Sequence, residues 1–352
     1  MVKVGIINVT GYAGAELARL LYNHPEADVV SVTGRSEAGK KLADVFPHLA
    51  SYDLTIEPEL ASGVDFVFSA LPHAASAEAC APLVRAGLPV VDISADFRLH
   101  DAAVYSEWYG GEHPAQDLLP DAVYGLPELH REAIKGAKAD GSIGLVANPG
   151  CYPESAILAL APAVKAGIIG PEIIVDSKSG VSGAGRGLKQ NLLLAEAGES
   201  VSAYGLDGHR HWPEIHQELA AIWPEGSAPK ITFTPHLIPM TRGILTTAYA
   251  PLMPGAVPDG DAGKSAVRKV YEQFYANEPF VRVAASPPAT KQTRGNNRCL
   301  VYPTVDVRTG RLVVVSVLDN LVKGAAGQAI QNMNLMLGMP ETTALDMPAV
   351  YP

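Results

Sequence analysis

Near its start the chain reads Val2-Lys3-Val4-Gly5-Ile6-Ile7-Asn8-Val9-Thr10-Gly11-Tyr12-Ala13-Gly14, an apolar run followed by a turn that contains glycine. The run 2–8 predicts a buried strand, and the residues after the turn predict a helix over 14–22. In a dinucleotide-binding fold, such a turn presents backbone N–H groups and a helix N-terminus to a pyrophosphate. A tight turn without a ligand is the alternative where the pattern stands alone.

Particular residues of this turn support the nucleotide interpretation. Gly11 lets the backbone approach a ligand, and Gly14 lets the helix pack closely on the strand. Asn8 replaces the first glycine of the dinucleotide pattern, and asparagine is the residue that next tolerates a positive φ. The residues expected to contact the cofactor here are Thr10, Gly11, Tyr12, Ala13 and Gly14.

The rest of the first half alternates apolar runs with helical stretches. Strands are predicted over 28–34, 65–71, 89–94 and 143–147, with a helix over 76–86. Continuous apolar strands separated by helices are typical of a parallel sheet covered on both faces. We therefore expect an α/β fold with a Rossmann-like dinucleotide-binding domain.

The pattern changes after about residue 150. Longer strands, rich in β-branched residues, are predicted over 230–240, 243–252, 298–307 and 311–318, with an amphipathic helix over 261–278. They predict an α+β catalytic domain with a mostly antiparallel sheet. A final helix over 321–337 returns to the small-residue style of the first half. We expect one domain from residues 1–149, completed by 320–352, and a second from residues 150–319.

Composition excludes several classes of function. The chain has 352 residues, of which 47% are hydrophobic, with 27 Lys plus Arg against 37 Asp plus Glu and a net charge of −10. This acidic balance argues against nucleic acid as a partner. Three cysteines are too few for a disulfide framework, and neither a signal peptide nor an apolar run of membrane-spanning length is present. The expectation is a cytoplasmic protein that does not bind a membrane.

The end of the second predicted strand bears on the choice of cofactor. It reads Thr33-Gly34-Arg35-Ser36, with Lys40 and Lys41 close behind. An acidic residue at this place favours NAD, whereas a cation and hydroxyls favour the 2′-phosphate of NADP. Arg35 and Ser36 therefore predict NADP; a solvated basic turn is the alternative.

Cys151 is the candidate nucleophile. It follows a buried strand in Asn148-Pro149-Gly150-Cys151-Tyr152-Pro153 and precedes an apolar helical stretch over 155–165. A cysteine at a helix N-terminus feels the positive end of the helix dipole, which favours the thiolate. Cys80, within a helical run, and Cys299, within a strand, fit a buried and inert position better.

A histidine cluster supplies the candidate acid or base. The segment Gly208-His209-Arg210-His211-Trp212-Pro213-Glu214-Ile215-His216 permits one histidine with Glu214 as its orienting partner. Zinc binding and a solvated His-rich turn are the alternatives. Pro213 argues against a helix that would set two histidines at i and i+4, and no HExxH spacing occurs, so no metal is expected.

Two further segments are candidate anion sites. Residues 179–186, Ser-Gly-Val-Ser-Gly-Ala-Gly-Arg, form a predicted loop of small residues that ends in a cation. Residues 92–98, Asp-Ile-Ser-Ala-Asp-Phe-Arg, end another strand of the first sheet, at its ligand-binding carboxyl edge. Each segment could instead be a flexible connection.

Seven motifs in order resemble one family over nearly the whole chain, N-acetyl-gamma-glutamyl-phosphate reductase of arginine biosynthesis. They are Gly11–Gly14, Ala70–His73, Asp92–Arg98, Asn148–Pro153, Ser179–Arg186, His209–Ile215 and Asp319–Gly324. The resemblance implies an NADP-binding domain and a second domain for catalysis and dimerisation. It also implies that the protein is a homo-oligomer, either a dimer or a tetramer, and that its substrate is a small acyl phosphate.

The resemblance also implies roles for single residues. Cys151 is the expected nucleophile and His209 the expected acid or base. Further cofactor contacts are expected from Leu71, Pro72, Ser182, Gly183 and Asn320, the last beside the nicotinamide. Substrate contacts are expected from Arg98, Asn148, Ser179, Arg186 and His211.

Two residues depart from the usual pattern of this family. Asn8 stands where the family usually has glycine, and Glu154 where threonine commonly follows Cys-Tyr-Pro, a position expected at the rim of the active site. A sister family reduces a lysine-pathway aminoadipyl phosphate, but it lacks the intact loop of residues 179–186. Aspartate-semialdehyde dehydrogenase is the other rival enzyme. A dinucleotide-binding redox sensor and a metal-dependent hydrolase represent other classes.

Overall fold

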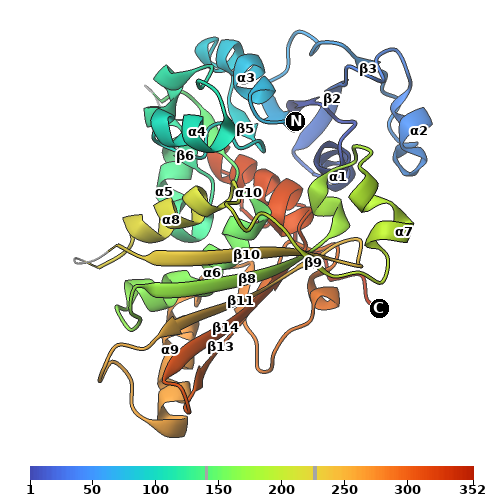
Figure 1. Cartoon of the computed structure of the whole chain (residues 1–352). Coiled ribbons are helices and arrows are strands. Elements are labelled where there is room, and N and C mark those ends of the chain that lie inside the picture. The colour runs from blue at the N-terminus through green and yellow to red at the C-terminus, as the bar shows by residue number, and fades with distance from the viewer. Residues whose placement is uncertain (139–141, 225–227) are drawn as a thin grey trace. The chain divides into compact units, whose positions relative to one another are not determined.

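The computed structural model describes residues 1–138, 142–224 and 228–352, which divide into two compact units (Figure 1). Unit 1 contains Met1–Gly150 and Ala325–Met347, and unit 2 contains Cys151–Gly324 and Pro348–Pro352. Among the described residues, none of the helices combines the length and the apolar character that crossing a membrane requires.

Unit 1 is built on a sheet with the strand order β3-β2-β1-β4-β5-β7-β6. The strands are β1 Val2–Ile7, β2 Ala27–Thr33, β3 Ile56–Glu57, β4 Phe66–Ser69, β5 Val90–Asp92, β6 Val123–Tyr124 and β7 Leu145–Ala147. All of the pairings between them are parallel. The strand order reverses at β1, and ligands bind α/β sheets at such a switch point, beyond the carboxyl ends of the strands. The predicted Rossmann-like fold is confirmed.

Helices cover this sheet. They are α1 Tyr12–Leu21, α2 Leu42–Val45, α3 Ala75–Arg85, α4 Ala102–Tyr109, α5 Pro127–Gly136 and α10 Gly327–Met336. Helix α1 packs on β1 and β2, and α10 contacts α1, α5 and β5. Cys80 of α3 lies in a core cluster with Val67 and Val90, because the apolar stripe of the helix faces the sheet. The end of the chain thus contributes a helix to the unit that its beginning forms.

Unit 2 contains a second sheet, in the order β12-β13-β14-β11-β8-β10-β9 (Figure 1). The strands are β8 Glu172–Gly180, β9 Ser202–Ala203, β10 Lys230–Ile238, β11 Ile244–Pro251, β12 Val281–Val283, β13 Cys299–Asp306 and β14 Arg311–Leu318. The β8–β10 and β12–β13 pairings are parallel and the others antiparallel. The predicted α+β domain with a mostly antiparallel sheet is confirmed.

The two faces of this second sheet differ. Its helices are α6 Cys151–Lys165, α7 Leu194–Ala197, α8 Trp212–Ala221 and α9 Gly260–Phe274. On β11, Thr246 is buried and accepts a hydrogen bond from Ser155 of α6, whereas the neighbouring Thr247 and Tyr249 are only half-buried. Successive side chains of a strand point to opposite faces, so α6 covers one face and the other stays open within this unit. Ile174, on β8, is 42% exposed.

Two segments differ from their predictions. Strand β8 was not predicted, because its open face carries Asp176 and Lys178, which interrupt the apolar pattern. It includes the first two residues of the predicted loop 179–186, and a 3-10 helix over Val181–Ala184 follows. The predicted helix 321–337 begins instead as a π-helical turn over Val322–Ala326, before α10.

Candidate active site

The turn after β1 has the backbone that its sequence predicts. Asn8 adopts a φ of +63°, which confirms its expected role as the substitute for glycine. Its side-chain Nδ2 donates to the carbonyl oxygen of Ala70 at 2.8 Å, and its Oδ1 accepts from the hydroxyl of Thr10 at 3.1 Å. The asparagine therefore fixes the turn with its side chain as well as its backbone.

Gly14 confirms the close packing of helix on strand. A Cβ atom added there would lie 2.5 Å from the carbonyl oxygen of Asn8 and 2.7 Å from the Cα atom of Val9. Gly11 caps helix α1 without a side-chain hydrogen bond. The first turn of α1 therefore offers backbone N–H groups to an anion, which suits the pyrophosphate of a dinucleotide.

A cavity of about 780 Å³ opens at the ends of β1, β2 and β4. Its lining includes Asn8, Arg35, Ser36, Leu71 and Pro72. Pro58, Glu59 and Leu60 also line it, although no sequence motif contains them. The cavity is large enough for an adenosine moiety and brings the Arg35 cation and the Ser36 hydroxyl to one place.

Arg98 and Asn148, expected to contact substrate, are engaged inside unit 1. Arg98 is 6% exposed, and its guanidinium donates to the carbonyl oxygens of Asn148 at 2.8 Å and Ile93 at 2.7 Å. Asn148 is fully buried, and its amide donates to the carbonyl of Ala325 and accepts from Asn332, both at 3.1 Å. These contacts hold the turn 148–150 that precedes Cys151.

Cys151 is the first residue of α6 and is half-buried, whereas Cys80 and Cys299 are fully buried. The helix N-terminus favours the thiolate of Cys151. Burial, reinforced by the charge of Asp92, raises the pKa of the Cys80 thiol and keeps it protonated. The predicted division into two core cysteines and one reactive one is consistent with these surroundings.

Aromatic side chains surround His209. Its ring lies 5.8 Å from that of Tyr152, 5.4 Å from Tyr204, 5.5 Å from Phe233 and 4.8 Å from His211, measured between centroids. Burial among these rings, together with the charge of Arg210, lowers the pKa of His209 to about 4. The imidazole is therefore neutral near pH 7.

A backbone group sets the tautomer of His209. The N–H of His211 donates to Nδ1 of His209 at 3.1 Å, so the proton of the neutral ring is on Nε2. The expected orienting group was the carboxylate of Glu214, which is buried in the first turn of α8. This expectation is corrected: the backbone of the short turn, and not the carboxylate, holds Nδ1.

The tyrosines connect His209 with the thiol. Tyr204 donates to the hydroxyl of Tyr152 at 3.1 Å, and Tyr152 donates to the carbonyl oxygen of His236 at 3.1 Å. Burial, with a smaller contribution from the charge of a Cys151 thiolate, raises the pKa of Tyr204 to about 12. The thiol and the imidazole thus both neighbour this pair of neutral phenols.

Pro213 does not interrupt the helix as the sequence suggested. Helix α8 begins at Trp212 with Pro213 in its first turn, where a proline's missing N–H costs nothing. His211 lies at the N-cap and His216 inside the helix. Among the described residues, no three His, Cys, Asp or Glu side chains are grouped so that they could hold a metal ion.

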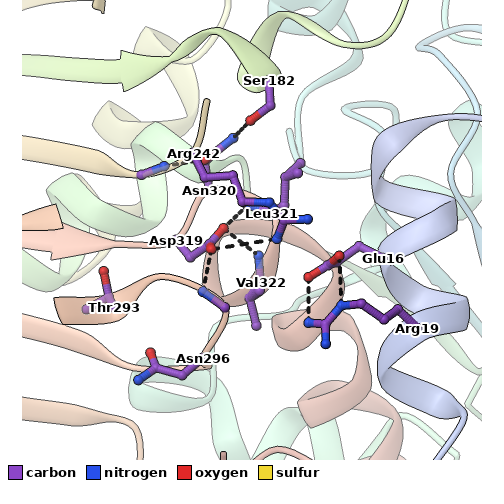
Figure 2. A network of polar contacts seen from close by, with 12 residues as sticks. Glu16, Arg19, Ser182, Arg242, Thr293, Asn296, Asp319, Asn320, Leu321 and Val322 are labelled. Carbon is purple, nitrogen blue, oxygen red and sulfur yellow. Dashed lines mark hydrogen bonds and ion pairs between the residues drawn. The ribbon is translucent and has the colours of Figure 1, made fainter. Parts of the chain in front are cut away.

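The loop after β8 and the segment 319–322 form one network in unit 2 (Figure 2). The amide of Asn320 donates to the hydroxyl of Ser182 at 2.9 Å and accepts from the backbone N–H of Gly243 at 2.7 Å. A Cβ atom added at Gly183 would lie 2.9 Å from Oγ of Ser179, so the loop is closely packed. Arg186, past the 3-10 helix, is exposed.

Asp319 fixes the start of the π-helical turn. Figure 2 shows its carboxylate accepting from the backbone N–H groups of Leu321 at 2.8 Å and Val322 at 3.3 Å. Its other oxygen accepts from the N–H of Gly295 at 2.7 Å and lies 3.7 Å from the guanidinium of Arg242. The segment that contains Asn320 is therefore rigidly held.

Glu154 is not at the rim, which corrects the sequence-based expectation. Its side chain is fully buried, and its Oε1 lies 3.5 Å from Nζ of Lys323, which is also fully buried.

Comparison with known proteins agrees with this geometry. Residues 3–137 match the semialdehyde dehydrogenase NAD-binding domain, and residues 151–320 match the semialdehyde dehydrogenase dimerisation domain. The N-acetyl-gamma-glutamyl-phosphate reductase of Dehalococcoides mccartyi (strain CBDB1) is 55% identical over 99% of each chain. That of Pelotomaculum thermopropionicum is 52% identical over 100% of this chain and 99% of its own.

This chain belongs to the N-acetyl-gamma-glutamyl-phosphate reductase family.

The resemblance read from the seven motifs is thereby confirmed, and the chain is an oxidoreductase. Solved structures of aspartate semialdehyde dehydrogenases share the fold. The one from Candida albicans with NADP has a TM-score of 0.69 at 19% identity over 96% of this chain and 99% of its own. The type II enzyme of Vibrio cholerae has a TM-score of 0.68 at 18% identity over 96% and 98%. Full-length relatives favour the reductase over these rivals, over the lysine-pathway enzyme and over a redox sensor.

Some residues at the site had no sequence signal of their own. Phe233 comes from a strand remote from His209 in sequence, so only the fold brings its ring to the imidazole. Tyr204 precedes the quoted histidine segment by a few residues and belongs to no motif. Tyr152 could have been suspected, since it follows Cys151 directly. Lys323 lies in the quoted motif Asp319–Gly324, but nothing in the sequence indicates its burial.

Proposed function

We propose that Cys151 carries the acyl group of N-acetyl-gamma-glutamyl phosphate during its NADPH-dependent reduction to N-acetyl-glutamate 5-semialdehyde and phosphate. The reduction is the activity of the family in arginine biosynthesis, and NADP is its cofactor. The observation that carries the proposal is a half-buried thiol at the N-terminus of α6, next to neutral phenols that also contact His209.

The thiolate attacks the acyl carbon of the substrate. A carbon–sulfur bond forms, the carbon–oxygen bond to phosphate breaks, and phosphate leaves with that electron pair. The thioester accepts hydride far more readily than a carboxylate would, so one hard reaction becomes two easier ones. When bound, NADPH supplies a hydride to the thioester carbon. The carbon–sulfur bond then breaks, which releases the semialdehyde and restores the thiolate.

His209 acts in this scheme through Nε2–H. Its Nδ1 accepts from the backbone of His211, so the neutral ring donates a hydrogen bond through Nε2. Such a donor stabilises the negative charge that develops on the acyl oxygen in both addition steps. The low pKa keeps the ring in this form across the neutral range. A neutral imidazole donor explains why the ring is enclosed by aromatic groups and not paired with a carboxylate.

The residues of unit 1 fit NADP. Helix α1 begins after Gly11 without a side-chain cap, so the N–H groups at its start suit a pyrophosphate. Gly14 lets the helix pack closely on the preceding turn. Arg35 and Ser36 line the neighbouring cavity and suit the 2′-phosphate. Thr10 to Gly14, Leu71, Pro72, Ser182, Gly183 and Asn320 complete the proposed set of cofactor residues.

Substrate contacts are proposed for Ser179, Arg186 and His211. Arg186 is an exposed cation beside backbone N–H groups of the small-residue loop, which suits phosphate. We propose that Arg98 and Asn148 stabilise the turn before Cys151 and do not contact the substrate. Their polar side-chain atoms already form hydrogen bonds with backbone carbonyl groups and with the amide of Asn332.

A second copy of the chain is the proposed partner. The match to a dimerisation domain covers the residues that form the second sheet, and that sheet has an open face carrying Ile174, Tyr249 and Tyr302. A dimer or a dimer of dimers would cover this face. The enzyme is proposed to work in the cytoplasm.

The test is the reverse reaction. Purified protein, given N-acetyl-glutamate 5-semialdehyde, NADP⁺ and phosphate, should form NADPH, and omission of phosphate should stop turnover after one equivalent. Aspartate semialdehyde under the same conditions should give little or no NADPH. Faster oxidation of aspartate semialdehyde would contradict the proposed substrate.

A further inference from the structure

Lys323 and Glu154 form an ion pair with no solvent exposure on either side. Nζ of Lys323 lies 3.5 Å from Oε1 of Glu154, and both side chains are 0% exposed. The ammonium also lies 5.8 Å from the ring centroid of Phe280, a cation–π distance. Lysine and glutamate are almost never fully buried unless paired, so the pair is a built feature of unit 2.

Both members of the pair adjoin Cys151. Glu154 follows Cys151 by three residues on α6, so the two side chains leave the same face of the helix one turn apart. Lys323 precedes Gly324, and a Cβ atom added to Gly324 would lie 2.8 Å from Cβ of Cys151 and 3.3 Å from its Cα. The residue next to the lysine is therefore the one that packs against the nucleophile.

Stability alone does not explain this arrangement. Two charges that leave water lose more solvation than their attraction usually returns, and apolar residues of similar volume would pack as well. The pair does provide a fixed link between two elements. One is the first turn of α6, and the other is the π-helical turn Val322–Ala326, a geometry that is frequent at functional sites.

We propose that Lys323 and Glu154 are positioning residues for Cys151, whose buried ion pair ties the Val322–Ala326 turn to the first turn of α6 and so holds Gly324 against the nucleophile. Asp319 fixes the start of the same turn through its backbone N–H bonds, and the ion pair fixes its middle. The pair also cancels the charge of a carboxylate one helical turn from the thiolate. The proposal rests on the assignment of Cys151 as nucleophile.

The experiment compares Glu154→Gln, Lys323→Met and the double variant in the full-length enzyme. Three quantities are measured for each: kcat, the KM for NADPH, and the rate at which iodoacetamide alkylates Cys151 at fixed neutral pH in a Cys80→Ala/Cys299→Ala background. Glu272→Gln, which breaks the half-exposed pair with Arg268 on α9, is the matched control.

The two single variants should change alkylation in opposite directions. Lys323→Met leaves a carboxylate near the thiolate and slows alkylation, whereas Glu154→Gln leaves an ammonium and speeds it. Misplacement of the thiol lowers kcat in both, by on the order of 10- to 100-fold, while the KM for NADPH changes less than about threefold. The double variant should recover the wild-type alkylation rate but not the wild-type kcat. The control should match the parent in all three.

Unchanged kcat in folded Glu154→Gln would overturn the proposal, since glutamine keeps the shape and removes the ion pair. A fall in kcat without opposite changes in the alkylation rates of the two single variants would also overturn the proposal. General loosening of the fold would then explain the lower kcat. If Lys323→Met does not fold, Glu154→Gln and the double variant still decide the question. Full turnover in Cys151→Ser would instead overturn the proposed function, whatever the pair does.

Discussion

Two helices of this chain begin directly after a buried strand of the parallel sheet, and their first turns differ. Helix α1 starts after Gly11, which adds no side chain to its N-terminus, and the backbone N–H groups are left for an anion. Helix α6 starts with Cys151, so the same positive helix end acts on a thiol that belongs to the chain. In the proposed function, the positive end of a helix would serve cofactor binding in unit 1 and nucleophile activation in unit 2.

The largest expected effect comes from the nucleophile. Cys151→Ser should reduce kcat by on the order of 10⁴- to 10⁶-fold, because the serine hydroxyl is not ionised where the thiol is. Binding of NADPH, measured by fluorescence titration, should stay within about twofold, since the cofactor turn lies in unit 1. Cys299→Ala is the control and should keep most of the activity. Retained turnover in Cys151→Ser would show that the N-terminus of α6 does not activate a nucleophile, and the proposed difference from α1 would be wrong.

His209→Asn comes next and tests the imidazole beside the thiol. Loss of the Nε2–H donor should lower kcat by on the order of 10²- to 10³-fold with little change in KM. In the wild type, kcat should not fall as pH drops through about 6.5, the ordinary pKa of histidine, because burial lowers the pKa of His209 to about 4. The sign follows from protonation at Nδ1, which breaks the hydrogen bond from the N–H of His211 that orients the ring and occurs only near the lowered pKa. An acidic limb centred near pH 6.5 and absent in His209→Asn would show that the ring titrates normally.

Gly14→Ala tests the cofactor end of the comparison. A methyl group would lie 2.5 Å from the carbonyl of Asn8, so the turn must move and the KM for NADPH should rise by at least about tenfold. Gly136→Ala, where a Cβ meets nothing within 4 Å, is the matched control. The rate at which iodoacetamide alkylates Cys151 should stay unchanged in both. Slower alkylation of Cys151 in Gly14→Ala would mean that a change at the N-terminus of α1 alters the thiol at the N-terminus of α6.

Arg35→Ser should separate the two nicotinamide cofactors. Removal of a charged hydrogen-bond donor to the 2′-phosphate should raise the KM for NADPH by about 10- to 100-fold and leave that for NADH unchanged. Steady-state kinetics with each cofactor measure the ratio. Equal increases in the KM for NADPH and in the KM for NADH would show that Arg35 does not recognise the 2′-phosphate.

The smallest effect is expected for Asn8→Gly. Glycine adopts the positive φ freely, but it loses the hydrogen bonds to Ala70 and Thr10. The free energy of unfolding should fall by about 1 kcal/mol, and the KM for NADPH should change less than about threefold. Denaturant titration and kinetics measure the two. A large loss of affinity would mean that the asparagine side chain shapes the cofactor site itself.

The sequence predicted unit 1 better than unit 2 for physical reasons. The backbone of the turn after β1 is local: the positive φ of Asn8 and the close approach at Gly14 arise within one strand, turn and helix, so residue type and spacing carry the geometry. Only the side-chain bond of Asn8 to Ala70 depends on a distant segment. The surroundings of Cys151 are not local. Phe233 packs on His209, and Lys323 pairs with Glu154, each from a segment distant in sequence. Strand β8, whose open face is polar, has no clean alternation. Pro213 misled because proline breaks a helix interior but begins a helix well.

The most direct test of the thioester at Cys151 is the intact mass of the enzyme after incubation with N-acetyl-glutamate 5-semialdehyde and NADP⁺ in the absence of phosphate. The expected result is a mass increase equal to one N-acetyl-glutamyl group, located on the peptide that contains Cys151 and released when phosphate is added. An unmodified mass alongside one equivalent of NADPH, or an adduct that persists in Cys151→Ser, would contradict it.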